Sequence, residues 1–372
     1  MTTTTRADGV EPLLVARNVV KNFPVRKAGL FGGTEQLQAV ADVSFEVYPG
    51  ETLGLVGESG CGKSTLARCV TRLYDLTSGA VEFEGRDIST LNRRQMRPLR
   101  REMQVIFQDP YGSLNPRRRV GSIIGDAFRI HEIDDARGSK RRVQELMELV
   151  GLNPEHYNRF PAEFSGGQRQ RIGVARALAL SPKIIVCDEP VSALDVSIQA
   201  QVLNLLGDLQ KELGLTYIFI SHDLSVVRHV SDRIAVMYLG KIVETADAET
   251  IFTESRHPYT RALLSALPPP DPDAAAGRER IVLSGDLPSP QDPPSGCRFH
   301  PRCPRAVDQC VTDVPITIPA FDDGPDHTAA CWRPMLASDN LVDSTPQIEN
   351  SIVGLDAAAF DVATDPDLEE TR

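Results

Sequence analysis

A glycine-rich segment, Gly57–Ser64 (GESGCGKS), constrains the fold of this chain more than any other feature. It matches the pattern G-x-x-x-x-G-K-[ST], follows the apolar run 52–56 (TLGLV) and precedes an amphipathic run over 65–74. This order predicts a strand, a phosphate-binding loop and a helix, because loop amides and the amino end of the helix then face an anion. In such a loop Lys63 reaches the β- and γ-phosphates and Ser64 binds Mg²⁺. The segment predicts an ATPase or a GTPase.

Apolar, β-branched runs alternate with longer amphipathic stretches between residues 13 and 267. This alternation predicts an α/β domain built around a largely parallel sheet. The runs 52–56 (TLGLV), 183–187 (KIIVC) and 216–220 (TYIFI) are nearly all apolar, as strands covered on both faces are. We expect these three runs to be the central strands.

Two adjacent carboxylates, Asp188 and Glu189, follow the second of these runs. Because side chains alternate along a strand, the two acids should point in different directions. One can then bind Mg²⁺ while the other orients an attacking water molecule. Taken alone, the pair could also be two acids that end a strand in a loop.

A second anion site is predicted at residues 164–168 (FSGGQ), which precede a helical run over 169–180. Ser165 and two glycines would lie at the amino end of that helix, where backbone amides are free to bind an anion. Two such helix ends, about a hundred residues apart, favour a chain in which each end binds a different nucleotide, one of them in a partner subunit.

With these motifs the chain resembles the ATP-binding subunit of an ATP-binding-cassette (ABC) transporter over residues 13–267. The resemblance implies the P-loop NTPase fold of an ABC nucleotide-binding domain, with a parallel-sheet core, an antiparallel β subdomain and a helical subdomain. It identifies 57–64 as Walker A, the run ending at Asp188 and Glu189 as Walker B, and 164–168 as the signature. Four further matches are the Q-loop glutamine Gln108 (VIFQDP), the D-loop aspartate Asp195 (SALD), the switch histidine His222 (FISHD) and the adenine-stacking aromatic Phe23.

The resemblance also implies a role for each matching residue. Catalysis falls to Lys63, Glu189 and His222, and Mg²⁺ to Ser64, Gln108 and Asp188. ATP would be bound by Phe23, Gly57, Ser59, Gly60, Cys61, Gly62, Lys63, Ser64, Thr65, Gln108 and His222. The signature residues Ser165, Gly166, Gly167 and Gln168 would cover the ATP of a partner subunit. Phe31 is the alternative adenine contact, and residues 26–38 are expected to be an insertion.

The chain beyond residue 267 changes in composition. Residues 268–296 hold eight prolines and predict a linker, residues 297–334 form a cysteine-rich module, and residues 335–372 form an acidic tail that is expected to be disordered. Residues 1–12 are expected to be a flexible N-terminus. Residues 257–264 (HPYTRALL) and the prolines after them resemble the C-terminal extension of ATPases that drive dipeptide and oligopeptide uptake.

Four late cysteines, Cys297, Cys303, Cys310 and Cys331, are spaced C-x5-C-x6-C-x20-C. Four thiolates suit zinc or an iron–sulfur cluster, and structural zinc prefers closer spacings. The resemblance to the peptide-transporter extension implies a [4Fe-4S] cluster, with Zn²⁺ and free or oxidised thiols as alternatives. His300 or His327 could replace one of the cysteines.

The implied function is that of the ATP-hydrolysing motor of an importer for dipeptides and oligopeptides. Its partners would be a second ABC ATPase subunit, expected to be a sister chain, two transmembrane permease subunits and an extracellular peptide-binding protein. The chain would act at the cytoplasmic face of the membrane, because residues 1–12 lack a secretory core and no apolar window is long enough to span a bilayer.

Other functions remain open at this stage. They are import of nickel or haem, a soluble ABC-type ATPase of DNA repair or translation, and a redox-gated regulator. A net charge of −11 and a pI near 5.2 argue against a nucleic-acid partner.

Overall fold

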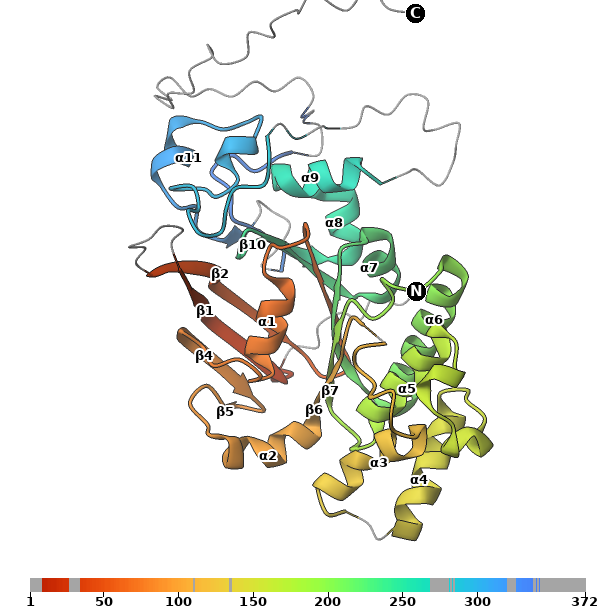
Figure 1. Ribbon diagram of the computed structural model, residues 1–372. Coiled ribbons are helices and arrows are strands. Elements are labelled where there is room, and N and C mark those ends of the chain that lie inside the picture. Colours follow the sequence, from red (N-terminus) through yellow and green to blue (C-terminus); the bar gives the residue numbers. More distant parts are fainter. Residues whose placement is uncertain are drawn as a thin grey trace, which may run out of the picture.

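Two β-sheets with a helix between them form the centre of the molecule (Figure 1). The computed structural model describes residues 9–26, 34–109, 111–133, 136–267, 281, 283, 285–319, 326–336, 339 and 341. Several predictions therefore lie outside the described residues. They concern most of the flexible N-terminus (1–8), Phe31, the start of the linker (268–280) and most of the acidic tail (342–372).

The larger sheet, which we call the core sheet, has eight strands in the order β11-β12-β10-β9-β3-β8-β7-β6. Its strands are β3 (Thr52–Val56), β6 (Met103–Ile106), β7 (Ile184–Asp188), β8 (Thr216–Ser221), β9 (Arg233–Tyr238), β10 (Lys241–Asp247), β11 (Ile318–Pro319) and β12 (Thr328–Ala329). The five strands from β9 to β6 pair in parallel. All residues of β3, β7 and β8 are buried, so the three predicted central strands are confirmed, with β7 beginning one residue later than expected.

The second sheet is antiparallel, in the order β2-β1-β4-β5. It consists of β1 (Leu14–Arg26), β2 (Thr34–Val47), β4 (Ser78–Phe83) and β5 (Arg86–Asp87). Residues 34–38 were expected to belong to an insertion, but they pair with residues 22–26 and lengthen the β1–β2 hairpin. Ladder hydrogen bonds satisfy the backbone there, and this part of the expectation is wrong.

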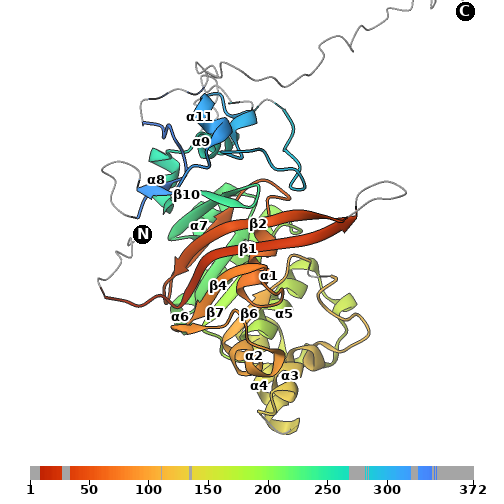
Figure 2. The same cartoon turned by 90° about the vertical axis from the view of Figure 1, so that its left-hand side faces the viewer.

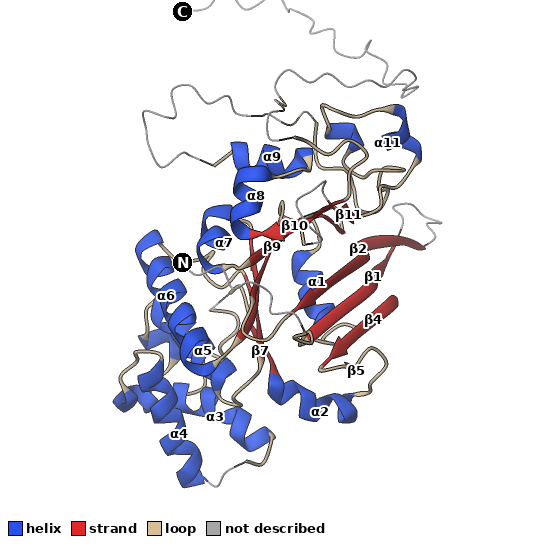
Figure 3. Ribbon diagram, turned by 180° about the vertical axis from the view of Figure 1, so that it is seen from behind, coloured by secondary structure: helices blue, strands red, loops and turns tan. Residues whose placement is uncertain are grey.

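Helices lie on both sides of the core sheet. They are α1 (Lys63–Val70), α2 (Arg93–Glu102), α3 (Val120–Ile130), α4 (Ala136–Leu149), α5 (Gly166–Leu178), α6 (Val196–Leu213), α7 (Leu224–Val230), α8 (Ala248–Glu254), α9 (Pro258–Ser265) and α11 (Asp308–Thr312). Helix α1 lies between the two sheets, and α5, α6 and α7 lie on the opposite side of the core sheet (Figure 3). Helices α3 and α4 form the helical subdomain with α5. Among the described helices, none is both long and apolar enough to cross a bilayer.

The described residues of 257–341, which we call the C-terminal extension, pack on the edge of the core sheet (Figure 2). Strand β12 pairs with β10, matching Thr245 with Thr328 and Glu244 with Ala329, and β11 continues the ladder. The cysteine-rich module is therefore joined to the ATPase core by main-chain hydrogen bonds. The predicted domain boundaries at residues 12, 267, 296 and 334 stay predictions.

Glu244 on β10 holds three parts of this region together. Its fully buried carboxylate accepts hydrogen bonds from the backbone amides of Arg256 and His257, which lie between α8 and α9. One carboxylate oxygen also lies 2.9 Å from Nε2 of His327, just before β12. Burial lowers the pKa of His257 to about 4, against the opposing charge of Glu244, so this side chain is neutral at pH 7. Its Nδ1 accepts the Tyr259 amide and caps α9.

Replacing Glu244 with Ala should destabilise the protein by about 2–4 kcal/mol, because two buried amides and a buried imidazole lose their acceptor. The change in the free energy of unfolding can be measured by urea denaturation. Glu249→Ala is the matched control, since Glu249 is exposed and pairs with Arg228 at the surface; its effect should stay below about 1 kcal/mol. Equal effects of the two variants would contradict this role of Glu244.

Candidate active site

The loop between β3 and α1, residues 57–62, is the phosphate loop predicted from the sequence. Two of its glycines cannot be replaced by a residue with a side chain. A Cβ atom at Gly57 (φ 154°) would lie 2.0 Å from the carbonyl oxygen of Met237, and one at Gly62 (φ 107°) would lie 2.1 Å from that of Ala39. Backbone contacts of this kind cannot yield to a side chain, so only glycine fits at both positions.

Lys63 lies inside this loop. Its side chain is buried, and its ammonium donates to the carbonyl oxygens of Gly57 at 2.8 Å and Glu58 at 3.0 Å. The charge is therefore held at the loop, where a phosphate group would be drawn to it. The thiol of Cys61 is buried beside the lysine, and burial raises its pKa, with the Lys63 charge as the leading opposing effect.

Ser64 and Asp188 join the start of α1 to the end of β7. The Ser64 hydroxyl donates to Asp188 Oδ1 at 2.7 Å. Burial raises the pKa of Asp188, and the Ser64 hydrogen bond and nearby cations oppose this shift. The two oxygens predicted to bind Mg²⁺ are thus adjacent. Mg²⁺ bound by one or two protein oxygens usually takes its other ligands from phosphate and water. Within the described residues, no group of three or more His, Cys, Asp or Glu could hold a metal ion.

Glu189 faces two of the other predicted site residues. Its Oε2 accepts a hydrogen bond from Gln108 Nε2 at 2.7 Å and lies 3.4 Å from His222 Nδ1. The three side chains follow β7, β6 and β8, whose carboxyl ends meet at one edge of the parallel sheet. Asp188 contacts Ser64 instead, so the two acids do point in different directions. The Glu189 backbone is left-handed (φ 48°), and its carbonyl accepts the Ser192 hydroxyl.

The signature residues begin α5. Ser165 caps the helix by accepting the Gln168 amide, and the Gln168 side chain accepts the Ser165 amide in return. A Cβ at Gly167 would lie 2.4 Å from Ile198 on α6, so the glycine permits close helix packing. Asp195 caps α6 by accepting the amide of Ile198. These contacts explain the local structure; the predicted contact with the ATP of a partner stays a prediction.

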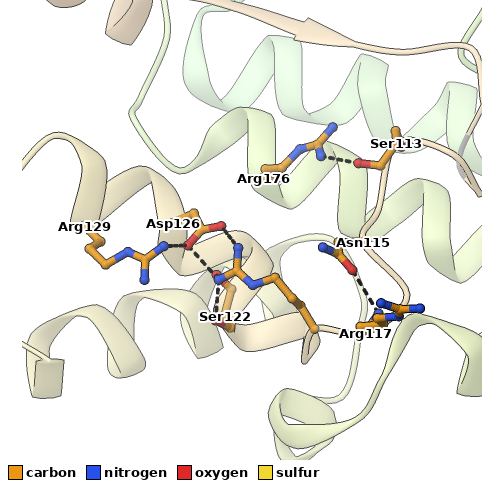
Figure 4. A network of polar contacts seen from close by, with 8 residues as sticks. Ser113, Asn115, Arg117, Ser122, Asp126, Arg129 and Arg176 are labelled. Atoms are coloured by element: carbon orange, nitrogen blue, oxygen red, sulfur yellow. Dashed lines mark hydrogen bonds and ion pairs between the residues drawn. The ribbon is translucent and has the colours of Figure 1, made fainter.

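Helix α5 also holds the segment that follows Gln108, which sequence reasoning missed. Arg176 donates to the carbonyl of Ser113 at 2.7 Å, as Figure 4 shows, and the guanidinium of Arg169 lies 4.2 Å from the ring centre of Tyr111. Beside them, Asp126 pairs with Arg118 and Arg129 within the helical subdomain. The signal that the sequence offers is a single arginine, Arg176, within the otherwise apolar run 172–180 (IGVARALAL).

Phe23 lies on β1 and is partly buried. Its ring packs edge-on against Tyr74, with 5.6 Å between centroids, and the Lys21 ammonium lies 5.0 Å from its centre. Sequence reasoning did not identify Tyr74 as its neighbour. Stacking of Phe23 on adenine stays a prediction.

The four late cysteines line one cavity in the C-terminal extension, together with His257, His300 and Arg305. Burial raises the pKa of Cys297 to about 11 and those of Cys303 and Cys331 to about 12. The seven cysteines all lie within the described residues, and none of them is joined to another by a disulfide. His300 lies at this cavity, whereas His327 is buried against Glu244.

Comparison with known proteins identifies two families along the chain. Residues 40–192 match the family described as "ABC transporter", and residues 243–310 match "Oligopeptide/dipeptide transporter, C-terminal region". The second match includes α9 and the first three late cysteines.

Two curated relatives are similar over most of their length. The chain is 52% identical over 324 residues to the Oligopeptide transport ATP-binding protein AppF of Bacillus subtilis, covering 86% of this chain and 97% of that protein. It is also 52% identical over 312 residues to the Probable peptide ABC transporter ATP-binding protein y4tS of Sinorhizobium fredii, covering 84% of this chain and 88% of that protein.

A solved structure shows the same fold. The dimeric ATP-binding cassette MJ0796, in a post-hydrolysis state bound to ADP and Pi, is 27% identical, with a TM-score of 0.56 over 63% of this chain and 98% of that chain. Because its phosphate loop, paired acids and signature helix occur together with these similarities, the chain belongs to the ABC transporter family of ATP-binding proteins.

Proposed function

We propose that this chain is the ATP-hydrolysing subunit of an importer for oligopeptides or dipeptides. The observation that carries the proposal is the match of residues 243–310 to the C-terminal region of oligopeptide and dipeptide transporters, within a chain 52% identical to AppF. These similarities favour transport over DNA repair or translation, and peptides over nickel or haem.

The proposed partners are a second ATPase subunit of the same architecture, a sister chain by our expectation, two transmembrane permeases and an extracellular peptide-binding protein. The dimeric MJ0796 cassette supports pairing of ATPase subunits. The exposed Ser165 at the amino end of α5 is available to cover a nucleotide on the opposite subunit. The chain would act at the cytoplasmic face of the membrane.

In the proposed mechanism the phosphate loop binds ATP through its amides and through Lys63. The Lys63 ammonium would leave the carbonyl oxygens of Gly57 and Glu58 and donate to phosphate oxygens instead. Ser64, Asp188 and Gln108 would hold Mg²⁺, which neutralises charge on the phosphates. Glu189 would orient the attacking water and accept its proton, and His222 would donate a hydrogen bond to the γ-phosphate. Gln108 now binds Glu189, so reaching Mg²⁺ requires it to release the carboxylate. ATP binding and the freeing of Glu189 would then be linked.

We further propose that Cys297, Cys303, Cys310 and Cys331 hold a [4Fe-4S] cluster. One observation supports it: the four thiols line one cavity. When bound, the cluster would cross-link the segments that carry the cysteines. The cluster binds deprotonated thiolates, but burial raises the pKa of these thiols and favours the protonated form. Binding of the cluster should therefore release protons.

Replacing Glu189 with Gln should lower kcat for ATP hydrolysis by about 10²–10⁴-fold, because the amide cannot accept the proton of the attacking water. The Kd for ATP should stay nearly unchanged. Both can be measured on the transporter complex, with Glu212→Gln on the exposed face of α6 as the control. A Glu189→Gln enzyme that hydrolyses ATP normally would exclude this role.

Cells that lack this chain should lose uptake of labelled dipeptides or oligopeptides. The wild-type chain should restore uptake and the Glu189→Gln variant should not. Normal peptide uptake together with lost nickel or haem uptake would show that the proposed substrate class is wrong.

The full chain purified without oxygen should be brown and contain about four iron and four sulfide per chain. Cys303→Ser should reduce the colour and the iron content, whereas Cys69→Ser, buried in the ATPase core, should retain both. A colourless protein with stoichiometric zinc would refute the cluster.

A further inference from the structure

The C-terminal extension contacts the phosphate loop directly, at Glu58. Tyr259 on α9 accepts the Glu58 amide at its hydroxyl oxygen, over 2.9 Å. Arg302 donates to both carboxylate oxygens of Glu58, at 2.9 and 3.2 Å. The Arg302 side chain is only 10% exposed and that of Glu58 27%, so water screens this ion pair less than it would at the surface.

Both partners are held firmly by their surroundings. Tyr259 is fully buried, and its ring packs against Tyr238 and Phe299 with centroids 4.7 and 5.4 Å away. Arg302 ends the short 3₁₀ helix His300–Arg302, three residues after Phe299. The ring cluster thus connects α9, β9 and the segment that carries Arg302. Both contacts to Glu58 therefore come from side chains that are almost wholly buried.

These contacts fix the orientation of one peptide group in the loop. In the peptide between Gly57 and Glu58, the Glu58 amide donates to Tyr259, while the Gly57 carbonyl oxygen accepts a hydrogen bond from the Lys63 ammonium. The phosphate loop binds anions only when its later amides converge, and that depends on how the loop leaves β3. Tyr259 therefore fixes the direction in which the loop leaves β3.

The ion pair has an electrostatic effect as well. Glu58 places a carboxylate on a loop whose ligand is a triphosphate, and an unpaired negative charge there would repel it. Arg302 neutralises this carboxylate and directs it toward the extension.

We propose that Tyr259 and Arg302 are positioning residues for ATP binding, supplied to the phosphate loop by the C-terminal extension. The inference rests on the proposed function only in taking ATP as the ligand of this loop. Neither residue touches the nucleotide; both act through Glu58.

Reversing the charge of Arg302, and then that of Glu58 as well, tests the ion pair. In the full chain with its partner subunits, Arg302→Glu should raise the Kd and the KM for ATP about five- to tenfold, with kcat changed less than about twofold. The double variant Arg302→Glu/Glu58→Arg should return the Kd to within about twofold of wild type, because the pair is restored with its charges exchanged. Damage to the cysteine-rich module alone would not be repaired by a change in the phosphate loop.

Arg228→Glu is the matched control, since it breaks an Arg–Glu pair with Glu249 that lies between α7 and α8; it should leave the Kd unchanged. Should Arg302→Glu fail to fold, Arg302→Gln and Arg302→Gln/Glu58→Gln give the same test: the single change leaves Glu58 unpaired and weakens ATP binding, and the double change restores it.

An unchanged Kd in the folded Arg302 variants, or the absence of rescue in the double variants, would overturn the inference. Either result leaves the proposed function intact as long as the wild-type chain binds ATP and loses turnover with Glu189→Gln. A wild-type complex that neither binds nor hydrolyses ATP would instead refute the proposed function.

Discussion

The rest of the structure depends on the close backbone contacts of the phosphate loop. Gly57 meets the carbonyl of Met237 on β9, and Gly62 meets that of Ala39 on β2. The loop is thereby enclosed between the core sheet and the antiparallel sheet, with α1 extending from it between them (Figure 1). Because neither contact leaves room for a Cβ atom, the separation of the two sheets and the shape of the anion site are set together.

Parallel strand pairing then determines which side chains can meet. The strands β6, β7 and β8 are adjacent and run in the same direction, so Gln108, Glu189 and His222 converge although they are distant in the chain. Ser64 approaches Asp188 from the loop side. The carboxylates consequently share a site while having different partners, which is the arrangement that allows one to bind a metal and the other to activate water.

Much of this could be predicted from sequence because its signals are local. The apolar runs became β3, β7 and β8, and the glycine pattern became the loop between β3 and α1. The pairing of β12 with β10 could not be predicted, because β12 has only two residues and register depends on distant partners. The same holds for residues 34–38, which were expected to be part of an insertion but pair with residues 22–26. Glu58 and Arg302 are 244 positions apart, and neither residue type signals the other.

The segment between Cys297 and Cys303 connects two features that would otherwise be separate. Its ends carry two of the four thiols that line one cavity, and Arg302 immediately precedes the second of them. Phe299, in the middle, packs on Tyr259 and Tyr238. With so few rotatable bonds between Cys303 and Arg302, any group that fixes the thiol also restricts the guanidinium, and through Glu58 the phosphate loop. The cysteine-rich module is thereby coupled to the phosphate loop through Glu58, which gives a physical reason for it to be packed against the ATPase core.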